Sequence, residues 1–134
     1  MKKYLLDTNV ISELSKPHPN AQVIAWFDSE PEVFLSVLTI GELLRGVVPL
    51  RSSNPRRADA LEAWLQRIRA EFAGSILDLD EAVAERWAAL PLRRTLPAID
   101  SLIAATALAH GLTVATRNVA DFADAGVEVC NPFE

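Results

Sequence analysis

The amino-acid sequence predicts an α/β fold with a central, mainly parallel sheet of about five strands. The first observation is that short runs rich in Val, Ile, Leu and Thr alternate with longer stretches whose apolar residues recur every three or four positions. Such alternation favours parallel strands connected by helices. The second observation is size, because 134 residues, 50% of them hydrophobic, suffice for a core. We therefore expect one domain over residues 1–134.

In the first half of the chain, prolines and polar residues separate the expected elements. These elements are a strand at 3–6, helices at 8–15 and 20–28, a strand at 32–37, a helix at 39–47 and a polar loop at 50–55. Pro17 and Pro49 follow two of the helices and end them, because the residue before a proline avoids the helical conformation. The loop, Leu-Arg-Ser-Ser-Asn-Pro, consists mostly of residues typical of turns.

The second half of the chain contains the clearest helix. The expected elements are a helix at 56–73, a strand at 75–79, helices at 80–90 and 97–110, and strands at 113–116 and 127–130 with a helical turn at 119–122 between them. The helix at 56–73 has one apolar stripe, formed by Leu61, Trp64, Leu65, Ile68 and Phe72. The helix at 97–110 ends before Gly111, which is a common C-terminal stop.

The charge of the chain limits its possible partners. A net charge of −5 argues against tight nonspecific binding of nucleic acid. Residues 43–72, however, contain six arginines against three acids, so this segment is either a solvated basic helix face or a contact for nucleic acid. No lysine follows Lys16, which excludes a P-loop, since that loop needs a lysine after its glycines.

The sequence also indicates where the protein resides. Its single cysteine, Cys130, allows no internal disulfide, which fits a reducing compartment. The apolar run near the N-terminus ends at Asp7, before a signal-peptide core could form. No apolar stretch is long enough to span a bilayer. We therefore expect a cytoplasmic protein without a membrane segment.

Four acids lie inside or directly after apolar runs: Asp7, Glu42, Asp100 and Asp121. A carboxylate among apolar neighbours loses hydration and must find a partner or take up a proton. Few lysines or arginines lie near these positions in the sequence. The missing partner is therefore expected to be a cation, and ligation by carboxylate oxygens suits Mg²⁺ or Mn²⁺.

The predicted fold would bring these acids to one place. Asp7 and Thr116 lie at the carboxyl ends of strands, and ligands of open parallel sheets bind just outside those ends. Glu42 and Asp100 fall in the first turns of helices that begin at the same edge. Each acid also has a structural alternative: Asp7 as a helix N-cap, Glu42 in a capping box with Thr39, and Asp100 as a partner of the helix dipole. Asp121 could cap a short turn, and Asp124 is a nearby competitor for its role.

Three segments resemble the PIN-domain ribonucleases, and most of all the VapC-type toxins of bacterial type II toxin–antitoxin pairs. These segments are LLDTNVISEL (5–14), SVLTIGELLRG (36–46) and LPAIDSLIAATALAHGLTVATRNVADF (96–122). The resemblance covers nearly the whole chain and implies a three-layer α/β/α fold. It assigns the acidic quartet of the family to Asp7, Glu42, Asp100 and Asp121. It assigns the small polar residues beside the metal to Thr8, Asn9, Thr116 and Asn118.

The resemblance implies an endoribonuclease that depends on Mg²⁺ or Mn²⁺, a small cognate antitoxin as partner, and a homodimer. The adjacent aromatic residues Trp26 and Phe27 favour an interface, because neighbours on one short helix are not expected to point into the same core. Two other classes remain open. One is an interaction module with a metal site too weak for turnover, and the other is a metal-dependent DNA nuclease or phosphatase.

Overall fold

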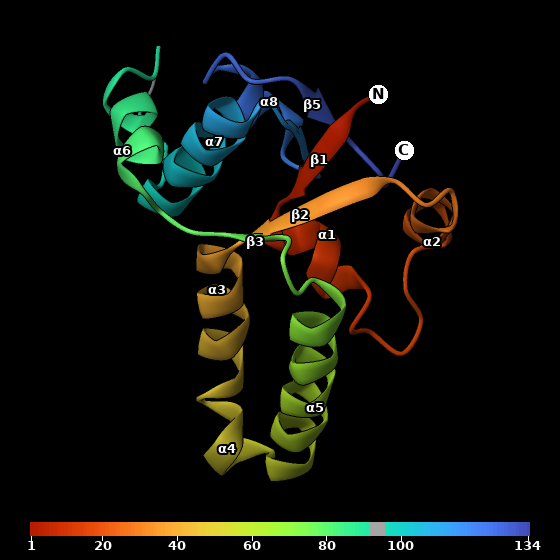
Figure 1. Ribbon diagram of the computed structural model, residues 1–134. Helices are drawn as coiled ribbons and strands as arrows, with labels where there is room; N and C mark the ends of the chain where they lie inside the picture. Colours follow the sequence, from red (N-terminus) through yellow and green to blue (C-terminus); the bar gives the residue numbers. More distant parts are fainter. Residues whose placement is uncertain (92–95) are drawn as a thin grey trace.

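The computed structural model describes residues 1–91 and 96–134, and within them it shows a five-stranded sheet whose strands are all parallel. The spatial order is β3-β2-β1-β4-β5 (Figure 1). The strands are β1 (Lys3–Leu6), β2 (Glu32–Ser36), β3 (Ile76–Leu77), β4 (Thr113–Ala115) and β5 (Val129–Cys130). The predicted fold class is therefore confirmed, although β3 and β5 are shorter than the sequence pattern indicates.

The helices occupy most of the positions expected from the apolar periodicity. They are α1 (Thr8–Glu13), α2 (Ala21–Asp28), α3 (Val37–Val47), α4 (Leu50–Ser53), α5 (Pro55–Glu71), α6 (Glu81–Ala88), α7 (Ala98–His110) and α8 (Val119–Ala123). None of the described helices is long and apolar enough to cross a membrane. Gly111 ends α7 in the left-handed conformation, with φ of 66°, as its position in the sequence predicts.

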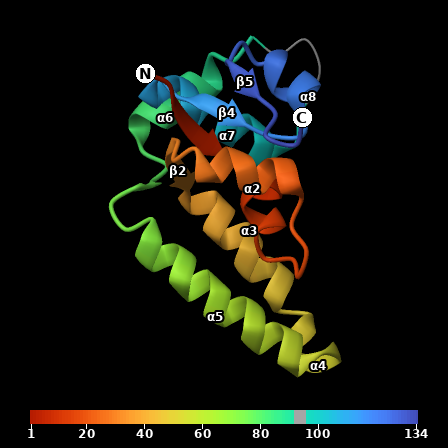
Figure 2. The same ribbon diagram turned by 90° about the vertical axis from the view of Figure 1, so that its right-hand side faces the viewer.

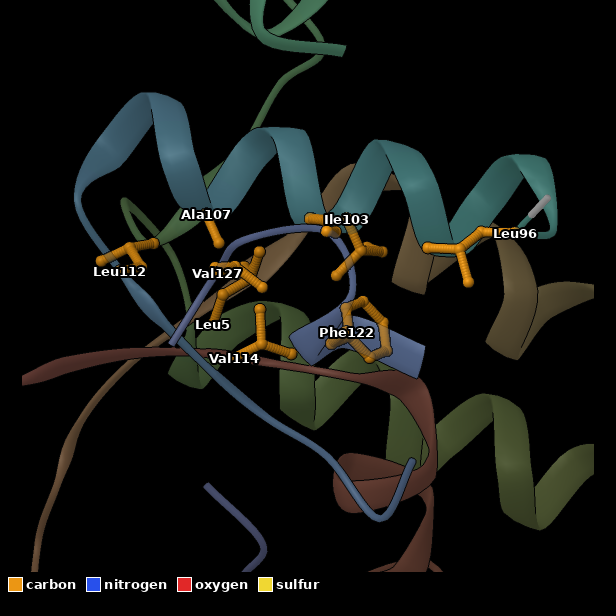
Figure 3. Close-up of a cluster of buried hydrophobic side chains, with 10 residues drawn as sticks. Leu5, Leu96, Ile103, Ala107, Leu112, Val114, Phe122 and Val127 are labelled. Atoms are coloured by element: carbon orange, nitrogen blue, oxygen red, sulfur yellow. The ribbon is translucent and has the colours of Figure 1, made fainter. Parts of the chain in front are cut away.

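The two faces of the sheet face different cores. Successive residues of a strand point to opposite faces, and Leu5 and Val114 accordingly face one cluster while Leu6 and Ala115 face the other. Figure 3 shows the first cluster, in which side chains of α7 meet Leu5, Val114 and the Phe122 ring of α8. In the second cluster the sheet packs against residues of α1, α3 and α5. The arrangement is the expected helix–sheet–helix layering.

Helices α3 and α5 form a pair that projects from the sheet, with α4 at its tip (Figure 2). The prediction of a loop at residues 50–55 is wrong here, because Leu50–Ser53 is helical. Both serine hydroxyls of this turn bond to the Pro49 carbonyl, so they satisfy the backbone instead of breaking the helix. Asn54 then caps α5 by accepting a hydrogen bond from Arg57 N.

The expectation about the two aromatic residues of α2 is also wrong. Trp26 and Phe27 are both half-buried and both pack against the second cluster, with their rings edge to face at 5.0 Å. Tyr4 of β1 meets Trp26 in the same geometry at 5.2 Å. The rings are wide enough to reach the core from two sides of the helix, so their adjacency is no evidence for an interface.

Candidate functional site

Asp7 follows β1 directly and is almost fully buried, with 5% of its surface exposed. Its backbone is extended, and its Oδ1 accepts a hydrogen bond from Thr8 N at 2.8 Å, so it is the N-cap of α1. Its Oδ2 accepts hydrogen bonds from Thr116 Oγ1 at 2.9 Å and from Asn9 Nδ2 at 3.3 Å. The structural alternative for Asp7 is thus correct, but capping uses only one of the two oxygens.

The electrostatics of Asp7 differ from those of the other buried acid nearby. Burial raises the pKa of Asp7; the hydrogen bonds from Thr116 and Thr8 oppose this rise, and the charge of Glu42 adds to it. Glu13 is equally buried, but its pKa is lowered, first by the hydrogen bond from Lys16 and then by that from Asn20 N. Glu13 therefore has a cationic partner, Lys16, whereas the charge that shifts the pKa of Asp7 is that of another carboxylate, Glu42.

Glu42 lies on α3 and is tied to the same edge of the sheet. Its Oε1 accepts a hydrogen bond from Thr8 Oγ1 at 2.5 Å, across 34 positions of sequence. The capping-box alternative for Glu42 is wrong, because α3 begins at Val37 and its N-cap is Ser36. The Thr39 hydroxyl, which a capping box would use, has no hydrogen-bond partner among the described residues. Glu42 is therefore held toward Asp7 through Thr8 and not toward its own helix terminus.

Asp100 gives the clearest electrostatic evidence of a cluster. It lies in the first turn of α7, and its pKa is raised to about 6. Burial is the largest cause, and the negative charges of Asp7, Glu42 and Asp121 follow in that order. The helix dipole favours an ionised acid at this position, so burial together with the repulsion from the other three acids outweighs the dipole.

Asp121 and the segment before it form the last part of the site at this edge of the sheet. Asp121 lies in the first turn of α8, and its charge reaches Asp100, whereas Asp124 is at the C-cap of that helix. The structure therefore favours Asp121 over its competitor. The N-cap position of α8 is Asn118, whose backbone N–H donates to Thr116 Oγ1 at 2.9 Å. The Thr116 hydroxyl thus links Asp7 to the start of α8.

Asn9 connects the two segments that contribute most of this edge. Its Nδ2 donates to Asp7, and its Oδ1 accepts a hydrogen bond from Arg117 N at 3.3 Å. The residues after β1 and after β4 are therefore joined by both Asn9 and Thr116. All eight residues that the sequence singles out contribute to one region of the molecule: Thr8 and Asn9 beside Asp7, Thr116 and Asn118 beside α8, and the four acids between them.

The donor set suits a hard divalent cation. Carboxylates that raise one another's pKa are stabilised by a cation placed between them, and Mg²⁺ prefers such oxygen ligands. Within the described residues, no three acidic, histidine or cysteine side chains are grouped closely enough to form a preformed metal site. Mg²⁺ retains several water ligands. The arrangement therefore fits an ion held directly by one or two carboxylates and through water by the others.

Two features near the acids could not be identified from the sequence. The Arg117 guanidinium lies over the Phe133 ring, 3.7 Å from its centroid. A groove of about 260 Å³ runs from the site between α3 and α5, and its lining includes Thr8, Glu42 and Trp64. The apolar stripe of α5 indicated a buried face, but not that part of this face borders the acids. No local pattern relates Arg117 to a residue sixteen positions later.

A parallel sheet with clustered carboxylates at the carboxyl ends of its strands defines a class of proteins suited to binding a hard cation. The chain belongs to the PIN-domain family, whose model matches residues 4–127. The resemblance noted in the sequence is thereby confirmed.

Comparison with individual proteins gives the same result. The chain is 45% identical to toxin FitB of Neisseria gonorrhoeae over 96% of its length and 97% of the relative. It is 35% identical to the VapC ribonuclease Y4jK of Sinorhizobium fredii over 97% of both chains. The crystal structure of FitAcB from N. gonorrhoeae superposes with a TM-score of 0.87, at 44% identity over 98% of this chain and 99% of that one. A toxin–antitoxin complex from Klebsiella pneumoniae superposes with a TM-score of 0.72, at 27% identity over 98% and 99%.

Proposed function

We propose that the protein is a ribonuclease that depends on Mg²⁺ or Mn²⁺ and is the toxin of a toxin–antitoxin pair. The observation that supports this most is the raised pKa of Asp100, which arises from burial and from three further carboxylates. Such a site is unfavourable without a cation. The family and the S. fredii relative, which is named a VapC ribonuclease, support RNA as substrate.

The proposed chemistry is hydrolysis of a phosphodiester bond. Water attacks phosphorus, the bond to the leaving oxygen breaks, and negative charge develops on the phosphate oxygens. A divalent ion held by these acids would supply the activated water and neutralise that charge. Asp7 and Asp100 are the proposed main ligands. Glu42 binds the ion or orients the attacking water, and Asp121 acts through water.

The small polar residues fix the carboxylates in place. Thr116 and Thr8 each donate to an acid, so they restrict how Asp7 and Glu42 can turn. Asn9 also donates to Asp7. Asn118 begins α8 and is proposed to contact the substrate phosphate or a metal-bound water. The proposed site thus combines charged ligands with neutral residues that hold them, as metal sites generally require.

A cleavage assay separates this proposal from its alternatives. Purified protein is incubated with single-stranded RNA, single-stranded DNA and a small phosphate monoester, in Mg²⁺, in Mn²⁺ and in EDTA. The proposal requires cleavage of RNA that EDTA abolishes. Preference for DNA or for the monoester would favour the other enzyme classes. Divalent-ion binding without cleavage of any substrate would favour an interaction module.

We propose that the antitoxin binds in the groove between α3 and α5. It opens at Thr8 and Glu42 and continues past Leu43, Gly46 and Trp64, so one peptide could cover the acids and an apolar surface together. The acidic edge would attract an arginine of such a peptide, which would then block the metal or the substrate. The K. pneumoniae structure, described as a toxin–antitoxin complex, supports a partner of this kind.

A further inference from the structure

The Arg117 guanidinium lies beside the part of the site that contains Asn118 and Asp121, and the proposed metal site does not use it. The side chain is exposed and stacks on Phe133, with Cζ 3.7 Å from the ring centroid. This contact fixes one face of the guanidinium and leaves its edge available. The backbone N–H of the same residue donates to Asn9 Oδ1, so the residue is anchored at both ends.

Within the part of the chain that the structure describes, the N–H donors of this guanidinium have no acceptor. Among residues 1–91 and 96–134, Arg117 donates no side-chain hydrogen bond and forms no ion pair. Its charge contributes only weakly to lowering the pKa of Glu13, as the last of five causes. An arginine that is held by an aromatic ring and is paired with no acid among the described residues is arranged for an external acceptor.

A hollow of about 430 Å³ opens beside this arginine. This volume falls within the roughly 300–1,000 Å³ of small-molecule sites. Its lining is Arg117, Asn118, Val119, Ala120, Asp121, Asn131 and Glu134. Asn118 and Asp121 also belong to the acidic edge, so a molecule in the hollow would lie directly beside the proposed metal. Asn131 Oδ1 accepts a hydrogen bond from Phe133 N, which ties the hollow to the aromatic ring.

The chemistry of the lining favours a nucleobase over a phosphate group. Glu134 would repel a phosphate, whereas its carboxylate can accept hydrogen bonds from the N–H groups of a base. Arginine donates bidentately to the O6 and N7 acceptors of guanine. Guanine combines those acceptors with N–H donors, so it matches the guanidinium of Arg117, the amides of Asn118 and Asn131 and the carboxylate of Glu134.

We propose that this hollow is a subsite for a guanine base next to the scissile phosphate, and that Arg117 determines that preference. The inference rests on the proposed ribonuclease function, and it assigns to this function a sequence preference. Single-stranded RNA is the form in which base edges are accessible to such a subsite.

The test uses single-stranded RNA oligonucleotides with each of the four bases at every position within two nucleotides of the cleavage site. Cleavage is compared for the wild-type protein, Arg117→Ala and Arg117→Lys. Arg86→Ala removes the same charge from an exposed position on α6 and is the matched control. Binding of the same oligonucleotides in EDTA is measured by fluorescence anisotropy, and Mn²⁺ binding by calorimetry shows whether the metal site is intact.

We expect the wild-type protein to prefer guanine at one position and Arg117→Ala to lower that preference roughly tenfold. Lysine keeps the charge but loses the planar fork, so Arg117→Lys should not restore the preference. Mn²⁺ binding and Arg86→Ala should match the wild type. A uniform loss of cleavage that lysine restores would overturn the base subsite, because it would identify a phosphate contact.

The two proposals fail in different ways. An unchanged cleavage pattern in Arg117→Ala overturns the subsite and leaves the ribonuclease standing. Guanine-dependent RNA binding that requires Arg117, in a protein that cleaves no RNA, overturns the ribonuclease and keeps the subsite. Absence of both RNA binding and cleavage overturns both.

Discussion

Ionisation of Asp100 is unfavourable in the folded chain, so the charge state of this one residue affects the stability of the protein. Its pKa is raised to about 6 from 3.8, so the folded state binds a proton more tightly than the unfolded state does. The ionised acid therefore destabilises the metal-free protein above pH 6, and this effect disappears as the pH falls below the unfolded value. An uncharged side chain of the same shape at this position should remove this destabilisation.

We accordingly predict that Asp100→Asn stabilises the metal-free protein at pH 8 by on the order of 1 kcal/mol. This gain is smaller than the raised pKa alone would give, because solvent screens the charge of a partly exposed side chain. The gain should shrink toward zero near pH 4. Thermal unfolding in EDTA at the two pH values measures this gain, with Asp124→Asn, at the C-cap of α8, as the control. A variant that is destabilised at pH 8 would contradict the repulsion between the acids.

Proton competition should also govern metal affinity. Asp100 must be ionised to bind a cation, and its pKa of about 6 lies within the range where affinity can be measured. We predict that Mn²⁺ affinity is nearly constant from pH 8 to pH 7 and falls severalfold between pH 6.5 and pH 5. Calorimetric titration at these pH values tests it. Equal affinity at pH 5 and pH 8 would show that the acids do not act as one site.

At the scale of elements, the groove between α3 and α5 can be tested without disturbing the core. A Cβ added at Gly46 would meet no atom within 4 Å, and this residue lines the groove. We predict that Gly46→Phe weakens binding of the proposed antitoxin by roughly tenfold or more, because the ring would occupy the surface proposed to bind the peptide.

Gly41→Phe on the same helix is the matched control, since position 41 is equally open but does not line the groove. Surface plasmon resonance gives the affinity, and RNA cleavage without antitoxin shows whether the site is intact. Unchanged affinity in Gly46→Phe would place the antitoxin elsewhere.

The elements that could be predicted from the sequence are those that depend on residues close together in the chain. The buried strands and the stripe of α5 could be read from periodicity, and Asp7 from its place after a strand. The short helix α4 was missed because its serines bond to Pro49 O, an arrangement that composition does not reveal. Contacts between distant segments, such as Thr8 with Glu42 or Arg117 with Phe133, depend on how the strands align. No pattern in the sequence predicts them.

At the scale of the whole molecule, the expected homodimer needs support other than Trp26 and Phe27. Trp87 on α6 is 48% exposed, and its Nε1 donates to Ser101 Oγ at 2.9 Å, so a large apolar surface is held in a fixed orientation. Leu79, just before α6, is 41% exposed. Aromatic residues of this kind are enriched at interface centres.

We predict that light scattering of the isolated chain gives twice the monomer mass of 14.7 kDa. Trp87→Glu should shift the mass to that of the monomer, because a charge would be buried at the interface. Glu85→Gln, an exposed change on the same helix, is the control. A strict monomer in the wild type would end the dimer proposal and leave the nuclease proposal standing.

The central claim is that four carboxylates from distant segments form one metal-dependent site for cleavage of RNA. The most direct measurement is the rate of single-stranded RNA cleavage in Mg²⁺ by the wild-type protein and by Asp100→Asn, with circular dichroism to show that the fold is kept. We predict that EDTA abolishes wild-type cleavage and that Asp100→Asn lowers the rate roughly 100-fold or more, since even residues that only orient ligands cost 10–100-fold. Full activity of Asp100→Asn in Mg²⁺, or cleavage that EDTA leaves untouched, would contradict the account.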